Sequence, residues 1–143
     1  MKTTIIAFVI FVSISVMNTF AANGSKIYRT TIADKETNSL TITVCEGKND
    51  INLIPLRKYT IKYDETGLPI EKILYTWNNT SGWIADKKYA YGYNDNGFLE
   101  VQSYTTWNKQ TNDWIDNVMY TMYVYDSENT IFDISNYNII AIK

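Results

Sequence analysis

An internal repeat is the feature that most constrains this chain. Residues 58–86 recur, position by position, as residues 88–116, and a partial third copy spans residues 119–129. The positions shared thirty residues apart are Tyr59 and Tyr89, Tyr63 and Tyr93, Gly67 and Gly97, Thr76 and Thr106, Trp77 and Trp107, and Asn78 and Asn108. A repeat with a period of about 20 to 50 residues is typical of architectures in which one supersecondary unit stacks on the next.

Each copy of the repeat is predicted to begin as a β-hairpin. Tyr59, Ile61 and Tyr63 alternate with polar residues, so one face of an extended strand carries an aromatic row. A turn follows each row, with Asp or Asn at its first position and Gly or Asn at its fourth. These residues favour a type I turn that closes into a β-bulge. The turn residues are Asp64, Gly67, Asn94, Gly97, Asp126 and Asn129.

The rest of the chain also has a strand-and-turn composition. Further strands are predicted at 27–32, 39–45 and 51–56, with one or two more in 131–142, and no segment has a helical pattern. Because an isolated hairpin is barely stable, successive copies must pair edge to edge. We therefore predict an all-β fold, an antiparallel meander of repeated hairpins in a twisted or curled single sheet. A small β-sandwich and a half-open barrel are the alternatives.

The N-terminus has the features of a secretory signal peptide. Lys2 precedes an apolar run over residues 5–17, and Thr19-Phe20-Ala21 supplies the small residues of a cleavage site. We expect a signal peptide at 1–21 and a single domain at 22–143. The apolar run is too short to span a bilayer comfortably, and no other candidate for a membrane span follows. The mature protein is expected to be exported and soluble, in the periplasm or outside the cell.

One motif resembles a known repeat. Ile61 to Gly67 contains Tyr-Asp-x-x-Gly after an alternating strand, with echoes that end at Gly97 and Asn129. This resembles the hairpins of tyrosine-aspartate (YD) repeat proteins, which belong to large secreted shells. With its signal peptide and Trp pairs, the chain is more similar to small exported β-repeat proteins of unknown function from Bacteroides-type bacteria. The resemblance covers roughly residues 58–129, implies repeated hairpins, and assigns no catalytic residue.

Composition excludes several functions. The chain has 13 basic and 15 acidic residues without a basic cluster, so nucleic acid is not an expected partner. It contains no His, which removes Ser-His-Asp and Cys-His mechanisms and the commonest zinc ligand. Asp86 and Asp116 are repeat equivalents that the architecture explains, and no segment has the spacing of a calcium loop.

We expect a protein that is not an enzyme and that has neither cofactor nor metal site. The lone Cys45 lies in a predicted strand, where it is either a buried apolar residue or an intermolecular link.

The tryptophans are the candidate binding residues. Their flat aromatic faces can stack on a sugar ring or on an apolar anchor of a protein, but cross-strand aromatic pairs also clamp hairpins. The leading hypothesis is a non-catalytic module that binds a glycan or a protein through an aromatic face, and the alternative is a structural module that self-associates through an exposed edge strand. The four candidates are Trp77, Trp83, Trp107 and Trp114.

Overall fold

The protein is described by a computed structural model that covers residues 11–17 and 24–140, with side chains from residue 24 to residue 136 except residue 132. These residues form ten β-strands and no helix. The strands are β1 (Phe11–Met17), β2 (Lys26–Asp34), β3 (Ser39–Gly47), β4 (Ile54–Tyr63), β5 (Pro69–Asn78), β6 (Gly82–Tyr93), β7 (Leu99–Asn108), β8 (Asp113–Trp114), β9 (Asn117–Tyr125) and β10 (Ile131–Ile140).

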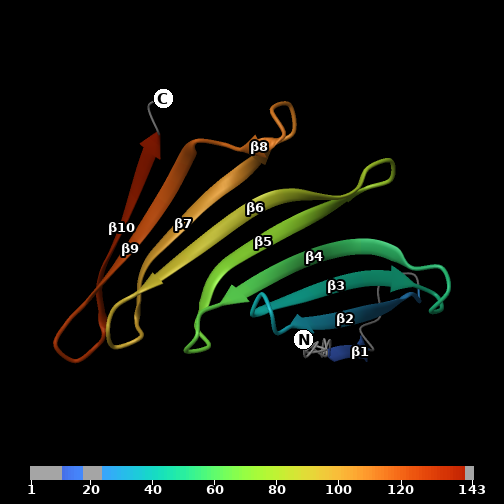
Figure 1. The fold of residues 1–143 in the computed structure, drawn as a ribbon, viewed down its shortest axis with the longest axis horizontal. Helices are drawn as coiled ribbons and strands as arrows, with labels where there is room; N and C mark the ends of the chain where they lie inside the picture. Colours follow the sequence, from blue (N-terminus) through green and yellow to red (C-terminus); the bar gives the residue numbers. More distant parts are fainter. Residues whose placement is uncertain (1–10, 18–23, 141–143) are drawn as a thin grey trace, which may run out of the picture.

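All the strand pairs are antiparallel, and they form one twisted sheet. Its order is β1-β2-β3-β4-β5-β6-β7-β9-β10, and the short β8 pairs with the end of β7. Figure 1 shows a single layer whose first and last strands lie at opposite edges. The prediction of an all-β antiparallel meander is confirmed, in the form of one open sheet. The alternatives, a β-sandwich and a half-open barrel, are not what these strands form.

The strand predictions outside the repeat hold in part. Residues 27–32 and 39–45 lie in β2 and β3, and 131–140 forms the single strand β10. The separate strand predicted at 51–56 is wrong, because β4 begins only at Ile54 and continues to Tyr63. The side chain of Asn49 accepts the amide of Asn52 at 3.2 Å, which holds the chain before Ile54 in a loop.

One face of the sheet carries the tyrosine rows. The register places Thr31, Ile42, Tyr59 and Leu74 side by side on this face, from β2 to β5. Ile42 is only 3% exposed and is the one buried hydrophobic residue among the described side chains. The most buried hydrophobic side chain of the tyrosine face therefore belongs to β3.

Burial continues along this tyrosine face into the second half of the sheet. The rings of Tyr89 and Tyr104 lie 5.1 Å apart across β6 and β7. Burial, and then the neighbouring tyrosines Tyr89, Tyr93 and Tyr123, raise the pKa of Tyr91 above its ordinary value. The neutral form of Tyr91 is thus the one that the folded sheet favours.

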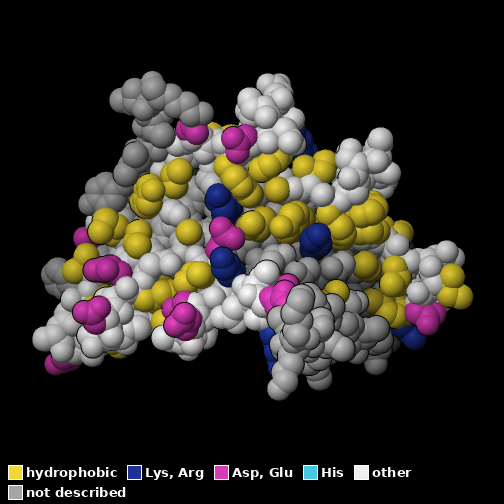
Figure 2. Space-filling model, in the orientation of Figure 1, with side chains coloured by type: hydrophobic (Ala, Val, Ile, Leu, Met, Phe, Trp, Pro, Cys, Tyr) yellow, Lys and Arg dark blue, Asp and Glu magenta, His cyan; other side chains and the backbone are white. Residues whose placement is uncertain are grey.

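A single open sheet leaves an unusual amount of surface exposed. The chain exposes 10828 Å², whereas a compact monomer of 16.6 kDa exposes about 7,600 Å². Hydrophobic side chains lie among charged ones over most of the face seen in Figure 2.

The three repeat turns have the same hydrogen bonds. Asp64 Oδ1 accepts the amides of Thr66 and Leu68, both at 2.9 Å, and Gly67 donates its amide to the carbonyl of Asp64 at 3.2 Å. These bonds, led by the one from the Thr66 hydroxyl, lower the pKa of the Asp64 carboxyl. The equivalent bonds are those of Asn94 with Asn96 and Phe98, and of Asp126 with Glu128 and Thr130.

A tyrosine hydroxyl links the second and the third repeat hairpin each to the one before it. Tyr93 donates its hydroxyl to the carbonyl of Pro69 at 2.7 Å, and Tyr125 donates its hydroxyl to the carbonyl of Leu99, also at 2.7 Å. Both bonds link the end of one repeat's first strand to the start of the previous repeat's returning strand. The repeated tyrosine thus has a structural role that accounts for its recurrence.

The fourth turn position supplies a test of the turn geometry. Gly67 and Gly97 have φ values of +88° and +80°, and Asn129 has a φ of +60°. A Cβ atom added at Gly67 would meet no atom within 4 Å, so the expected cost of a larger residue there is backbone strain at positive φ. We expect Gly67→Val and Gly97→Val each to lower the free energy of unfolding by more than about 1 kcal/mol. Asn129→Gly is expected to be neutral or slightly stabilising, as measured by urea denaturation. Equal midpoints for all three variants would contradict the assignment.

The predicted signal peptide overlaps the first strand. Phe11–Met17 pairs with β2 in the full-length chain, and the expected cleavage site after Ala21 lies outside the described residues. The described residues contain no helix that is long and apolar enough to cross a membrane.

Candidate functional site

Two equivalent turns position the tryptophans. Each follows a Thr-Trp-Asn sequence, at the end of β5 and at the end of β7. Asn78 Oδ1 accepts the amides of Thr80 and Ser81, both at 2.9 Å, and Asn108 Oδ1 accepts the amide of Gln110 at 2.9 Å. The turns end at Gly82 and Asn112, with φ values of +75° and +54°. Each turn therefore returns the chain so that a second Trp lies opposite the first.

The four predicted tryptophans form two cross-strand pairs. Trp77 pairs with Trp83 at a ring-centroid distance of 5.2 Å and an interplanar angle of 71°. Trp107 pairs with Trp114 at 5.0 Å and 83°. Both arrangements are edge-to-face, the geometry that aromatic quadrupoles favour. The register places both pairs on the face opposite the tyrosine rows, which we call the tryptophan face.

A lysine from each repeat lies over these rings. Lys58 Nζ is 4.4 Å from the ring centroid of Tyr75 and 5.8 Å from that of Trp83. Lys88 Nζ is 4.6 Å from the ring centroid of Trp114. Lys58 and Lys88 are repeat equivalents, so each copy contributes one cation-π contact to its own Trp pair. Sequence reasoning missed these lysines, although their position at the start of each copy could have indicated them.

Partial exposure gives the pairs two possible roles. Trp77 is 40% exposed, and its indole N–H donates to Asn79 Oδ1 at 3.0 Å, whereas the other three tryptophans are half-buried. None of the four is fully buried in the sheet. They clamp neighbouring strands and still present aromatic surface to solvent.

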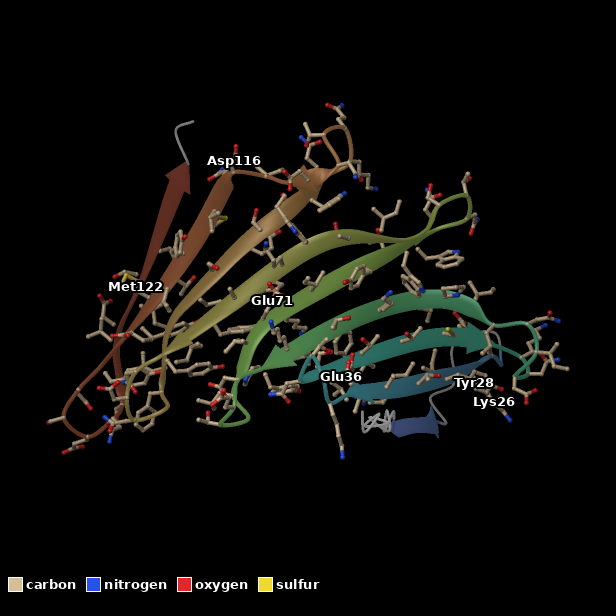
Figure 3. The ribbon with its side chains drawn as sticks, in the orientation of Figure 1. Lys26, Tyr28, Glu36, Glu71, Asp116 and Met122 are labelled. Atoms are coloured by element: carbon tan, nitrogen blue, oxygen red, sulfur yellow. The ribbon has the colours of Figure 1, made fainter. Side chains whose placement is uncertain are left out.

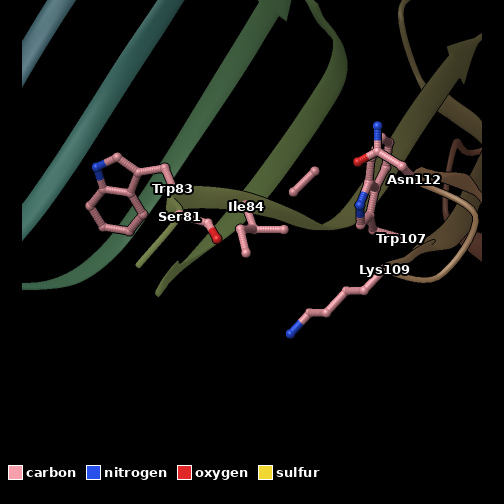
Figure 4. A pocket seen from close by; sticks show the side chains of 7 residues that line it. Ser81, Trp83, Ile84, Trp107, Lys109 and Asn112 are labelled. Atoms are coloured by element: carbon pink, nitrogen blue, oxygen red, sulfur yellow. The ribbon is translucent and has the colours of Figure 1, made fainter. Parts of the chain in front are cut away.

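A groove of about 520 Å³ lies between the two pairs. Trp83 and Trp107 lie at opposite ends of it, with Ile84 between them (Figure 4). One tryptophan from each of the two full repeats therefore lines the groove. Its lining residues are Ser81, Trp83, Ile84, Ala85, Trp107, Lys109 and Asn112. We call this site the tryptophan groove.

The polar residues of the tryptophan groove escaped the sequence reasoning. Lys109 and Asn112 lie in the turn after β7, which is one residue longer than its counterpart after β5. They were missed because the repeat comparison draws attention to shared positions and away from insertions. An ammonium, an amide and the hydroxyl of Ser81 supply both donors and acceptors at the margins of two aromatic rings.

Other candidate groups lie apart from this groove. Cys45 is half-buried on β3, and burial raises the pKa of its thiol. Within residues 24–136, no group of three or more Cys, Asp and Glu side chains is placed to hold a metal ion. Asp86 is the unpaired residue of a β-bulge in β6, between Ala85 and Lys87, which each have a partner on β5. Asp86 thus lies within a strand, whereas its repeat equivalent Asp116 lies between β8 and β9.

The chain belongs to the family described as a family of unknown function, DUF3836, which matches residues 1–123. A protein of unknown function from Bacteroides fragilis has a similar solved structure, with a TM-score of 0.52 and 17% identity over 72% of this chain and 87% of that one. A DUF3836 family protein from Parabacteroides distasonis matches with a TM-score of 0.39 and 16% identity, over 92% of this chain and 91% of that one. No curated protein matches the chain. The expected similarity to proteins of unknown function from Bacteroides-type bacteria is confirmed, and the likeness to YD repeats stays a prediction.

Proposed function

We propose that this protein is an exported, non-catalytic module that binds a glycan in the tryptophan groove. The observation that carries the proposal is the groove itself, in which two indole rings from successive repeats lie at the ends and three polar side chains, with two apolar ones, complete the lining. Its volume of about 520 Å³ falls in the range of small-molecule sites, about 300 to 1,000 Å³.

The chemistry of the groove matches a sugar. A pyranose ring has an apolar C–H face that stacks on an indole and a rim of hydroxyls that require hydrogen-bond partners. Trp83 and Trp107 supply the stacking surfaces, and Ser81, Lys109 and Asn112 supply the partners. The ammonium of Lys109 favours a glycan with a carboxylate or sulfate group over a neutral one.

Two sequence features support a role in binding rather than catalysis. The chain has no His, and none of the seven residues that line the groove is a carboxylate. Hydrolysis of a glycosidic bond by the common mechanism needs two carboxyl groups about 5 to 10 Å apart across the bond.

The apolar run at 5–17 and the small residues before Ala22 support export.

A glycan array, followed by titration of the tightest ligand, tests this function. We expect the protein to bind an acidic glycan, and we expect Lys109→Ala to weaken that binding at least fivefold, because it removes the one cation of the groove. Lys72→Ala is the matched control, since Lys72 Nζ lies over the ring of Tyr59 at 5.1 Å on the opposite face. Binding to no glycan, or capture of a protein at the groove instead, would overturn the proposal.

A further inference from the structure

The N-terminal strand occupies an edge that export would uncover. β1 pairs with β2 over seven residues, from Phe11 opposite Ala33 to Met17 opposite Ile27. All of β1 lies within the segment 1–21 that the sequence predicts to be removed. The inference below rests on the export part of the proposed function. Removal of β1 would leave β2 as the first strand of the sheet, with its outer N–H and C=O groups unpaired.

β2 has few of the devices that protect an edge strand. It runs for nine residues, contains no Pro, and pairs with β3 without a register shift. Exposed edge strands of this kind template pairing with another strand. In the full-length chain, β1 itself shows that this edge accepts an antiparallel strand. The start of β2 is marked in Figure 3 by Lys26 and Tyr28, beside β1.

The sequence of β2 is complementary to itself. When two copies of Lys26–Asp34 are placed antiparallel about Thr30, all nine residues find a partner. Lys26 then lies opposite Asp34 at both ends, and Tyr28 lies opposite Ile32 on both sides of the centre. Opposite charges, and aromatic with β-branched residues, are favourable cross-strand pairs. A register centred on Arg29 would instead place two like charges opposite each other.

We propose that removal of residues 1–21 converts β2 into the interface of a two-fold symmetric dimer, in which β2 of one copy pairs antiparallel with β2 of a second copy about Thr30. The dimer joins two sheets into one continuous sheet and uses the same surface on both copies, so it closes. Pairing of β2 with β10 of another copy would instead extend without limit.

The exported protein tests this proposal directly. The full chain is produced in a bacterial host that exports it, and the secreted form is examined by intact mass and by light scattering. We expect a chain that begins at Ala22 and a dimer in solution. Thr30→Lys, which places two like charges at the axis, is expected to raise the dimer dissociation constant at least tenfold with an unchanged far-UV spectrum.

Cysteine cross-linking determines which residues of the two β2 strands lie opposite each other. The variants carry Cys45→Ser, so that the introduced cysteine is the only one in the chain. Directly opposed residues in antiparallel strands have Cα atoms about 4.5 to 5.5 Å apart, within the range for a disulfide. We expect Thr30→Cys to form an interchain disulfide under mild oxidation. Thr31→Cys is the control, because its counterpart in the other copy lies diagonally, about 7 to 8 Å away.

The possible results test the dimer independently of glycan binding in the groove. A monomer that begins at Ala22, open-ended polymers without the Thr30→Cys disulfide, or equal cross-linking of both Cys variants would each overturn the dimer. A secreted chain that begins at Met1 would overturn the export premise and the dimer together. Glycan binding, measured on the same preparations, reports on the groove whichever of these results is obtained.

Discussion

Ile42→Ala is expected to lower the free energy of unfolding by about 2 to 5 kcal/mol. Ile42 is only 3% exposed, and its neighbours in register are Thr31 on β2 and Tyr59 on β4. The substitution removes buried methyl and methylene groups and leaves a cavity in a sheet that has no second layer to collapse into it. Since small domains are stable by about 5 to 15 kcal/mol, this single change would remove a large share of the total.

Ile54→Ala is the matched control for Ile42→Ala. It is the same substitution on the adjacent strand β4, but Ile54 is 64% exposed. We expect its effect to stay within about 1 kcal/mol, because little transfer free energy is lost. Urea denaturation of both variants gives the comparison. Similar midpoints for the two would show that stability is not concentrated under β3.

The hairpins of the repeat were predictable because their determinants are local. Asp64 Oδ1 bonds amides two and four residues ahead, so the turn can be read from a window of five residues. The positive φ at Gly67 is likewise a property of one position. The hairpin between β2 and β3 has similar local bonds, from the amides of Glu36 and Thr37 to Asp34 Oδ1, but it also depends on distant contacts. Its turn residue Asn38 is held by side-chain bonds to the carbonyls of Tyr63 and Asp64, which are distant in sequence.

The tryptophan groove was only partly predictable. The four tryptophans stood out as repeat equivalents, but whether they were exposed depended on how the sheet curves and on whether a second layer covers it. The bulge at Asp86 sets which residues of β6 lie opposite β5, and no local pattern in the sequence reports a bulge. The groove combines residues from β6 with residues from the turn after β7, so its lining follows from register and from a one-residue insertion.

The arrangement of the two Trp pairs allows clamping to be separated from binding. Each pair contributes one ring to the tryptophan groove, Trp83 from the first and Trp107 from the second, while Trp77 and Trp114 lie outside its lining. Two double variants therefore break both pairs equally. The variant Trp83→Ala with Trp107→Ala also removes the groove's aromatic ends, whereas Trp77→Ala with Trp114→Ala leaves them in place.

Both double variants are expected to lose stability, because each breaks two edge-to-face contacts worth about 0.5 to 1.5 kcal/mol apiece beyond the buried area. Only Trp83→Ala with Trp107→Ala is expected to abolish recognition, with binding of the tightest glycan weakened at least a hundredfold, about 2.7 kcal/mol. Trp77→Ala with Trp114→Ala should keep the affinity within about threefold, which is about 0.7 kcal/mol. Thermal melts establish that both variants are folded at the temperature of the titrations. Equal losses of affinity in the two variants would mean that the tryptophans serve the sheet and not a ligand.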